Sequence, residues 1–434
     1  MTPPGSRGYR RYVLGSLMLV NAIIVLDRGL MGLLLEPIKE ELHLSDANLG
    51  FLTGIAFGLF YAALGIPIAR WADRGNRVTI VSAALSLWAA TVMLYLFVTS
   101  FLQLVVARVA AAVGEAGGMP PTYSLIGDYF PAANERTRAM TVYALADPLA
   151  VLVSFVLGGW LNERFGWRIA FASMGVPALF IALLVRMSVA EPRSRASRRT
   201  PESPPSLREA MVTLWRQPTT RHLILGIILL FTVGLGLGPW EAAFLMRTHG
   251  LNTTELGRWL GVIFSFGGMG GVAAGGYVAA RWFAEEEASQ LRFCATLIAL
   301  QVPCLVAFLL LPGSRGSLVA LIPAVATFNA IFGPTFALLQ RLVPDEIRAT
   351  TMAVVMLLAN LIGMGVGPQS VGLLSDLLEP ALKVDSLRYA MLAISSVAFW
   401  SAYHFWRAGH SVGQDLVAVR VQDRGSVAWS QAAK

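Results

Sequence analysis

Charged residues are scarce in this chain. Asp, Glu, Lys and Arg make up 14% of its 434 residues, whereas a soluble globular domain carries roughly 25%. Hydrophobic residues account for 56% of the sequence, and 41 residues are Gly. A water-soluble fold of this composition would leave large apolar patches on its surface. The composition therefore excludes a soluble enzyme and a disordered scaffold, and it indicates an integral membrane protein.

Cysteine is nearly absent, and the motifs of several enzyme classes are missing. Cys294 and Cys304 are the two cysteines, and on one helix they would lie about 15 Å apart, which is too far for a disulfide. The sequence has no G-x-x-x-x-G-K-[ST] loop, no H-E-x-x-H and no G-x-S-x-G, and its five His residues are scattered. We therefore expect no enzyme, no metal and no cofactor.

Apolar runs bounded by charge, Pro or Gly recur along the whole chain. One membrane helix needs about 20 apolar residues, so twelve helices would take about 240 residues, which agrees with the hydrophobic fraction. We expect an all-α integral membrane fold with twelve spans. They cover residues 12–34, 48–69, 78–99, 102–127, 139–161, 168–189, 222–246, 256–280, 292–312, 317–340, 349–374 and 388–407.

Basic residues cluster in alternate loops. Most of the 34 Lys and Arg residues lie at the two termini and in every second loop, and such basic loops remain in the cytoplasm. Both termini are then cytoplasmic, which requires an even number of spans. These loops also explain the net charge of +8, so no nucleic-acid partner is expected.

A basic segment rich in Pro and Ser divides the chain. It covers residues 191–221 and cannot cross a membrane. On either side we expect a six-helix bundle, at 1–190 and at 222–410, and after the second bundle a cytoplasmic tail at 411–434.

The two halves also resemble each other in sequence. Phe130–Met140 is similar to Val343–Met352, and Ala69–Arg74 is similar to Gly276–Arg281 at nearly the same spacing. This pattern indicates an internal duplication. Two pseudo-symmetric six-helix repeats with a site between them are typical of secondary transporters.

Six charged residues lie inside the predicted spans. Each costs about 2.5–3.5 kcal/mol at the bilayer centre, so each is expected to be paired or functional. For the acids of spans one and four, we favour a role in transport over a structural ion pair that fixes helix register. The six residues are Asp27, Arg28, Arg108, Glu115, Asp147 and Glu241.

Helical geometry limits how the first four of these can pair. Arg108 and Glu115 are seven residues apart, so they share a helix face but are too distant for a tight pair. Asp27 and Arg28 differ by about 100° around their helix. We expect Asp27 and Glu115 to share a cavity near an arginine. Burial raises the pKa of a carboxyl group and a guanidinium lowers it, so a carboxyl balanced between the two effects can load and release a proton.

The remaining two acids leave alternatives open. Asp147 precedes Pro148, whose ring frees backbone carbonyls, so local hydration makes the acid tolerable in either a structural or a functional role. Glu241 follows Gly238-Pro239-Trp240 in the outer third of span seven. There it faces the cavity, contacts a cationic substrate or reaches the membrane interface.

The loop after the second span carries a family signature. It reads Ala69-Arg70-Trp71-Ala72-Asp73-Arg74-Gly75-Asn76-Arg77 and resembles the signature loop of the major facilitator superfamily. The resemblance implies a charge latch in which Asp73, Arg74 and Arg77 hold the cytoplasmic side shut. Ala69 stands where the family usually has Gly, and Ala280 stands where the repeated loop would have an acid.

Longer segments narrow the resemblance to spinster-type transporters of the bacterial branch. Leu26–Gly54 contains an Asp-Arg pair in span one and a Leu-Ser-Asp turn, and Arg108–Gly117 has an Arg before Gly-x-Glu-Ala. Phe244–Gly261, Gly333–Pro344 and Ala359–Leu378 are also similar.

The spinster resemblance implies residue roles and a substrate class. Asp27 and Glu115 match the acids that sense protons, and Arg28 and Arg108 match their basic neighbours. Eukaryotic members move lysophospholipids and sphingosine phosphate. We therefore expect a monomeric, proton-coupled transporter of the bacterial inner membrane, moving an amphiphilic or lipid-like organic anion by rocking alternating access.

Other functions fit the same sequence. A drug-efflux antiporter and a symporter of small organic acids and protons share the fold, and a membrane receptor that transports nothing would share it too. A lipid-modifying enzyme lacks a nucleophile–base or metal cluster, and a channel lacks a repeated pore loop. Sodium coupling and the direction of transport stay open.

Overall fold

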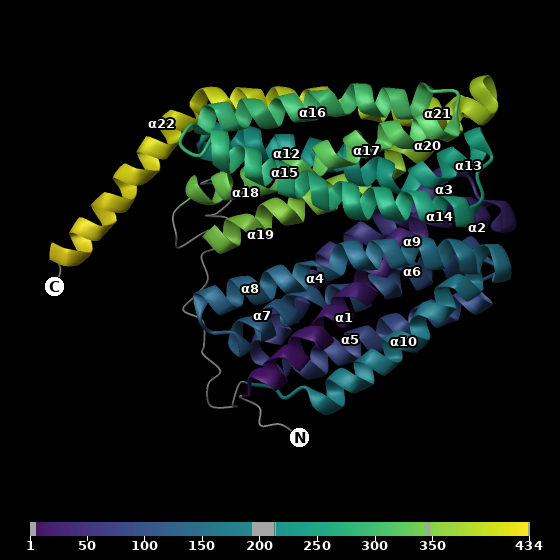
Figure 1. The fold of residues 1–434 in the computed structure, drawn as a ribbon, viewed down its shortest axis with the longest axis horizontal. Coiled ribbons are helices and arrows are strands. Elements are labelled where there is room, and N and C mark those ends of the chain that lie inside the picture. Colours follow the sequence, from purple (N-terminus) through teal and green to yellow (C-terminus); the bar gives the residue numbers. More distant parts are fainter. Residues whose placement is uncertain (1–5, 193–211, 213, 344–347, 433–434) are drawn as a thin grey trace. The chain divides into compact units, whose positions relative to one another are not determined.

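The computed structural model describes residues 6–192, 212, 214–343 and 348–432. Side chains are described for these residues except at 66, 69, 70, 73, 74 and 349 and beyond 418. Every regular element in these ranges is helical (Figure 1). Most of the predicted linker, residues 193–211 and 213, lies outside the described residues.

Eleven stretches of the described residues are helical, apolar and long enough to cross a membrane. The last of them, Thr350–Ala418, has 69 residues and is interrupted at Lys383–Asp385, where Lys383 has a φ of 49°. Because about 20 residues suffice for one crossing, this stretch supplies two. The described chain therefore has the twelve crossings that the sequence predicts.

The crossings of the first half comprise ten α-helices, several of which share one crossing across a short break. They are α1 (Arg7–Leu33), α2 (Leu35–Leu42), α3 (Asp46–Thr53), α4 (Ile55–Arg74), α5 (Arg77–Leu94), α6 (Phe101–Ala116), α7 (Met119–Tyr129), α8 (Ala133–Ala144), α9 (Ala146–Phe165) and α10 (Trp167–Ser188).

The second half follows the same pattern, with π-helical turns at Ile263–Gly267 and Ala359–Met364. Its helices are α12 (Pro218–Leu237), α13 (Glu241–His249), α14 (Thr253–Val262), α15 (Gly268–Trp282), α16 (Glu287–Leu310), α17 (Ser314–Ala330), α18 (Phe332–Arg341), α19 (Arg348–Leu358), α20 (Gly365–Leu382), α21 (Ser386–Ser395) and α22 (Val397–Ala432).

Local sequence explains where several helices begin and end. Asn252 and Glu255 form a capping box at the start of α14, which satisfies backbone N–H groups that a helix start leaves open. α9 and α13 end at Gly166 and Gly250, whose φ angles are 81° and 65°. Gly adopts this left-handed conformation without steric cost.

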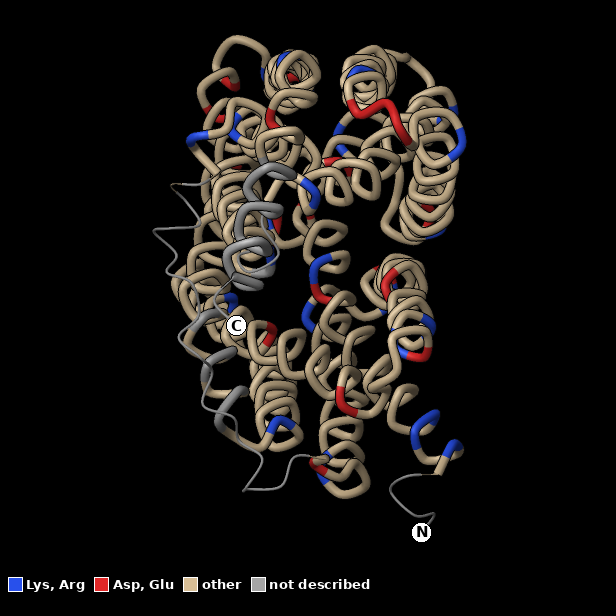
Figure 2. Tube along the Cα trace, turned by 90° about the vertical axis from the view of Figure 1, so that its left-hand side faces the viewer, with Lys and Arg blue, Asp and Glu red and all other residues tan. Residues whose placement is uncertain are grey.

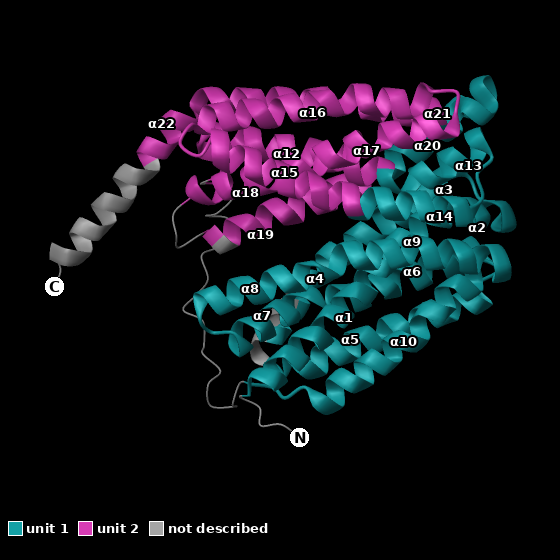
Figure 3. Ribbon diagram, in the orientation of Figure 1, with its two compact units in different colours: residues 1–200, 238–265, 368–387 teal, residues 201–237, 266–367, 388–434 magenta. Residues whose placement is uncertain are grey.

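One compact unit, called unit 1 here, draws on three parts of the sequence. It contains residues 1–200, 238–265 and 368–387 (teal in Figure 3). Within it, the Ser154 hydroxyl on α9 donates a hydrogen bond of 2.6 Å to the Leu26 carbonyl of α1. Gly159 brings α9 so near to α14 that a Cβ at this position would lie 2.2 Å from the Thr253 carbonyl oxygen. Small residues thus allow the helix backbones of unit 1 to touch.

The other compact unit, unit 2, contains residues 201–237, 266–367 and 388–434 (magenta in Figure 3). Its long helices α16 and α22 run side by side (Figure 1). The Ser401 hydroxyl on α22 donates to the Gly226 carbonyl of α12 at 2.7 Å, and Gln290 Nε2 donates to the Pro334 carbonyl at 2.9 Å. Neutral hydrogen bonds therefore join the helices of unit 2.

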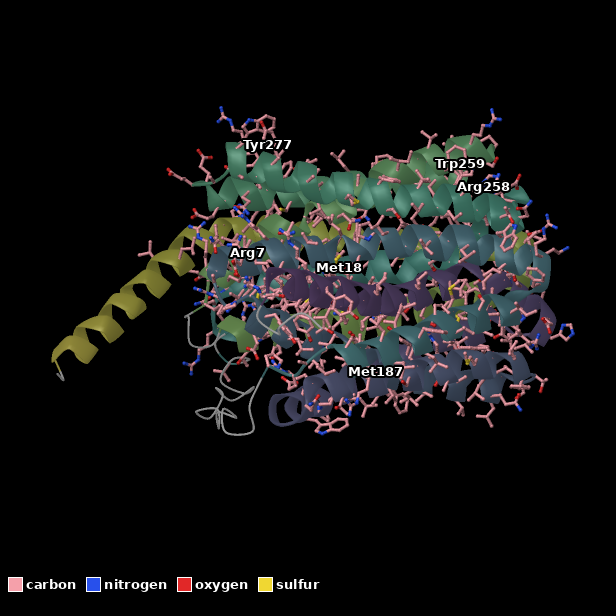
Figure 4. All side chains as sticks on the ribbon, turned by 60° about the horizontal axis from the view of Figure 1, so that its bottom comes forward. Arg7, Met18, Met187, Arg258, Trp259 and Tyr277 are labelled. Carbon is pink, nitrogen blue, oxygen red and sulfur yellow. The ribbon has the colours of Figure 1, made fainter. Side chains whose placement is uncertain are left out.

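The helix surfaces are apolar, as a bilayer requires. Charged residues occupy short segments of a chain trace that is otherwise uncharged (Figure 2). Many large hydrophobic side chains are exposed around the helices, and Met187, Trp259 and Tyr277 are labelled examples (Figure 4). Exposure on this scale would be unusual in a soluble monomer and is expected where lipid tails cover the protein.

Candidate functional site

Two consecutive residues of α1 form ion pairs with α6 inside unit 1. Asp27 accepts a hydrogen bond from Arg108 Nη1, and the exposed fractions of these two side chains are 0% and 3%. The Arg108 guanidinium also lies 4.3 Å from the ring centroid of Phe57 on α4. The pair is thus fully enclosed, with a cation–π contact on one side.

The second pair is less enclosed. Arg28 Nε donates to Glu115 Oε2 at 3.1 Å, and Glu115 has no exposed side-chain surface whereas Arg28 is 33% exposed. The Arg28 guanidinium lies 5.3 Å from the ring centroid of Phe57 and 5.0 Å from that of Tyr61. Arg28 therefore links the buried charges to the surface.

We call Asp27, Arg28, Arg108 and Glu115 the charge quartet. Arg108 and Glu115 each find a partner on another helix, as their separation of two turns predicts. The sequence did not indicate Phe57 and Tyr61 as members of the site. Their spacing of four residues, which places both rings on one face of α4, is the signal that could have found them.

The two ion pairs of the quartet meet at one aromatic ring. The guanidinium groups of Arg28 and Arg108 lie 5.3 and 4.3 Å from the ring centroid of Phe57. Asp27 Oδ1 and Glu115 Oε1 are both buried, and neither accepts a hydrogen bond from a donor in the described residues. A proton on either oxygen would add the donor that this carboxyl group lacks.

Asp147 lies at the start of α9 and forms no ion pair with the quartet, although the positive charge of Arg28 acts on it. It accepts a hydrogen bond from Asn21 Nδ2 on α1, and it is partly exposed. No Arg, Lys or His of the described residues lies within 4.0 Å of its carboxylate. Its hydrogen-bond partner is therefore a neutral amide.

Glu241 lies at the start of α13 and is 6% exposed. Its Oε2 is buried, with no hydrogen-bond partner among the described residues. The side chain is therefore enclosed by protein.

The predicted latch is described in part. The side chains of Asp73 and Arg74 lie outside the described residues. Arg77 is fully buried at the start of α5, where its Nη2 pairs with Asp128 at 2.7 Å and its guanidinium also binds Glu191. Arg77 thus bridges acids of its own half of the sequence.

A second ionic cluster was not predicted, and we call it the Asp46 network. Arg247 on α13 donates to both carboxylate oxygens of Asp46 on α3, at 2.7 and 2.8 Å. Lys39 and Ser375 also donate to Asp46, at 2.7 and 2.6 Å. Arg247 also pairs with Glu36. Asp376 is the sixth member of the network.

Asp376 completes the Asp46 network through the backbone. Its carboxylate accepts from the N–H groups of Asp46 and Ala47 at 2.9 and 2.8 Å, so it caps the N-terminus of α3 where a negative charge is favourable. Nothing in the sequence indicates this network, because charged residues near span ends ordinarily face water.

Unit 2 brings two of the scattered histidines together. His222 Nδ1 on α12 and His404 Nδ1 on α22 lie 2.9 Å apart. Within the described residues, no group of three or more His, Cys, Asp or Glu is arranged to hold a metal ion. Cys294 and Cys304 are free thiols on α16.

Comparisons with known proteins agree with this architecture. The family model for the Major Facilitator Superfamily matches residues 17–368. An "MFS-type efflux pump" of Mycolicibacterium smegmatis is 32% identical over 407 residues, which is 93% of each chain. The chain therefore belongs to the Major Facilitator Superfamily, with its fold of twelve transmembrane helices in two six-helix bundles, and it is a transporter rather than an enzyme.

Within the superfamily the chain is spinster-like, as the sequence predicts. "Protein spinster homolog 1" of Xenopus laevis is 25% identical over 90% of this chain and 79% of its own length. The crystal structure of a bacterial homologue of the human lysosomal transporter spinster, inward-facing and unoccupied, matches with a TM-score of 0.85 and 27% identity. That match covers 95% of this chain and 99% of the other. The occupied form of that homologue gives a TM-score of 0.82.

Proposed function

We propose that this transporter is a proton-coupled secondary active transporter and that the charge quartet is its proton site. The observation that carries the proposal is that Asp27 and Glu115, each paired with an arginine in one buried group of charges, both keep a buried oxygen that lacks a donor. A proton on either carboxyl group supplies that donor. Loss of the proton leaves a buried negative charge that an arginine of the quartet balances.

Arg28 is the residue through which substrate and proton act on each other. It is the partly exposed member of the quartet, and it donates to Glu115. An anionic group of the substrate that binds Arg28 draws the guanidinium away from Glu115. The uncompensated carboxyl then takes up a proton, because a buried carboxylate without a partner is costly. Substrate binding and proton binding are coupled by this exchange of partners.

Two ionic clusters supply the alternating closures of the transport cycle. The Asp46 network lies between loops that the charge pattern places outside the cytoplasm, and Asp73, Arg74 and Arg77 lie in a loop that it places inside. With both termini cytoplasmic, the two clusters are at opposite ends of the spans. The bundles at 1–190 and 222–410 rock about the site as one cluster forms and the other breaks.

The substrate is an amphiphilic or lipid-like organic molecule with an anionic group, and the protein works as a monomer in the bacterial inner membrane. Arg28, backed by the rings of Phe57 and Tyr61, offers guanidinium and aromatic surface together, and the enclosed Arg108 adds positive charge behind it. Drug efflux is the second candidate, and the description of the 32% identical mycobacterial relative as an efflux pump favours it.

The test is transport by purified protein in liposomes that hold a pH-sensitive dye. Extraction of radiolabelled lysophosphatidic acid into external albumin measures substrate movement, and ethidium serves as the drug probe. With a pH gradient imposed, we expect Glu115→Gln to lose at least about tenfold of the gradient-driven flux, since general proton-transfer groups contribute on this scale. The dye signal that accompanies substrate movement should disappear as well.

Glu285→Gln is the matched control, because Glu285 is exposed and lies between α15 and α16. It should transport like the unmodified protein, and both variants should elute as folded protein. If Glu115→Gln keeps the gradient response, Glu115 has no part in coupling. If ethidium moves and lysophosphatidic acid does not, the substrate class is wrong.

A further inference from the structure

Asp147 stands in a setting that the quartet does not explain. It is a partly exposed carboxylate within an apolar span, and its one hydrogen-bond donor among the described residues is the amide of Asn21. A carboxylate in such a place needs a cation or a proton to offset the loss of hydration. The surroundings of Asp147 decide which of the two fits.

Hydrogen-bond acceptors dominate these surroundings. Asn21 is 1% exposed, and because its Nδ2 is used by Asp147, its Oδ1 is left buried without a donor in the described chain. The Asn21 oxygen and the Asp147 carboxylate therefore offer at least two acceptors side by side. A ligand that satisfies both must donate more than one hydrogen bond.

Aromatic rings complete the surroundings. Tyr123 on α7 and Tyr143 on α8 form an edge-to-face pair with ring centroids 5.6 Å apart, and Tyr143 precedes Asp147 by four residues, about one helical turn. Tyr143 is buried, whereas Tyr123 is 45% exposed. The negative faces of tyrosine rings attract organic cations. An exposed ring next to a carboxylate leaves room for such a group to enter.

We propose that Asp147, Asn21 and Tyr123 form a subsite for a protonated amine of the transported molecule. An ammonium group supplies a positive charge for Asp147, N–H donors for both oxygens and a cation for the ring. A proton on Asp147 would be donated to Asn21 Oδ1 once the amide flips, but it would leave the aromatic surface without a cation, and a sodium ion would not require the ring. This subsite rests on the proposed transport function and refines it, because it gives the substrate a cationic group in addition to the anionic group held by Arg28.

The test measures binding without any gradient, so it does not depend on proton coupling. Calorimetric titration of the purified full-length protein uses three rigid molecules of one shape: 1-adamantanamine, which is cationic, 1-adamantanol, which is neutral, and 1-adamantanecarboxylate, which is anionic. We expect the amine to bind at least about tenfold more tightly than the alcohol, as a charged hydrogen bond implies. Equal affinity of amine and alcohol, or no amine binding at all, would overturn the proposal.

Three variants test where on the protein the amine binds. Asp147→Asn should weaken amine binding at least about tenfold while leaving alcohol binding unchanged, and Tyr123→Ala should weaken it by about twofold to fivefold through the lost ring. Asp147→Glu keeps the charge and should keep most of the affinity, which separates lost recognition from lost folding. An Asp147→Asn variant that binds the amine like the unmodified protein would overturn the subsite. So would amine binding that sodium chloride abolishes but potassium chloride at the same concentration does not.

Failure of the amine subsite can be distinguished from failure of the proposed proton coupling. Glu115→Gln should bind the amine normally even though its gradient-driven flux is lost. Amine binding that depends on Asp147, found in a protein without proton coupling, would retain the subsite and remove the coupling. Proton-coupled flux in a protein whose amine binding does not depend on Asp147 would remove the subsite alone.

Discussion

The two compact units bury different chemistry. Every buried Asp, Glu and Arg among the described side chains belongs to unit 1: Asp27, Glu36, Asp46, Arg77, Arg108, Glu115 and Glu241. The described part of unit 2 buries hydroxyl groups, amides and the imidazole of His404 instead. Both units are built from apolar helices, so hydropathy alone does not separate them.

This contrast shows how the two units are held together. Unit 1 depends on ion pairs whose members are costly when left alone in a membrane. Close backbone contact between helices occurs in both units, and in unit 2 an example is Gly275 of α15 against α17, where a Cβ at Gly275 would lie 2.0 Å from the Ala330 carbonyl oxygen. Breaking a buried charge should therefore be the most damaging change in unit 1, whereas in the described part of unit 2 it should be a methyl group at such a contact.

The largest expected effect follows from removing one charge of the quartet. Arg108→Ala leaves Asp27 buried without its partner, so we expect a loss of about 3–5 kcal/mol in the free energy of unfolding. Gln301→Leu in unit 2 removes a buried amide whose Oε1 has no donor in the described chain, and it should change the free energy by less than about 1 kcal/mol. Denaturant unfolding in detergent measures both. Equal losses for the two variants would abolish the contrast.

An intermediate effect is expected from steric crowding in unit 2. Gly275→Ala places a methyl group against the Ala330 backbone and should cost about 1–3 kcal/mol. The neighbouring Gly276→Ala is the control, because no atom lies within 4 Å of its Cβ position and Ala favours a helix. Thermal unfolding should rank Gly276→Ala at or above the unmodified protein. If Gly275→Ala is equally stable, close contact does not hold unit 2 together.

The smallest effect concerns the one titratable pair that joins α12 to α22. A hydrogen bond between His222 and His404 needs at least one neutral ring, and Arg221 and Arg407 lie nearby. His404→Gln should cost about 1 kcal/mol at pH 8. This difference should shrink once the pH is low enough for both rings to carry a proton, because two imidazolium rings cannot share a hydrogen bond. A difference that stays constant from pH 8 to pH 4 would show that the pair does not sense protons.

The sequence predicts the fold well because each crossing carries its own signal. A run of about 20 apolar residues needs no tertiary information to be recognised, and the predicted spans overlap the observed helices throughout. The breaks within crossings were predicted only where Pro and Gly mark them. Helices α8 and α9 are separated at Leu145, three residues before Pro148, whose ring clashes with the carbonyl four residues earlier.

The candidate site was predictable in its members and not in its contacts. Asp27, Arg28, Arg108 and Glu115 stand out because charge is rare inside apolar spans. Their pairing depends on how α1 and α6 are rotated against each other, which a single sequence does not encode. Asp46 and Arg247 lie at span ends, where charge is ordinary, so their interaction became visible only in three dimensions.

The composition of unit 1 has a consequence for biogenesis. Asp376 binds the N-terminus of α3 across 330 residues of sequence, and Ser375 binds Asp46 across 329. During synthesis, α3 enters the membrane long before either residue leaves the ribosome. The early helices must therefore persist as a partly assembled intermediate, with Asp46 served by Lys39 alone until α13 arrives. Final assembly of unit 1 waits for α20, so a nascent chain truncated before residue 375 would be a sensitive substrate for membrane quality control.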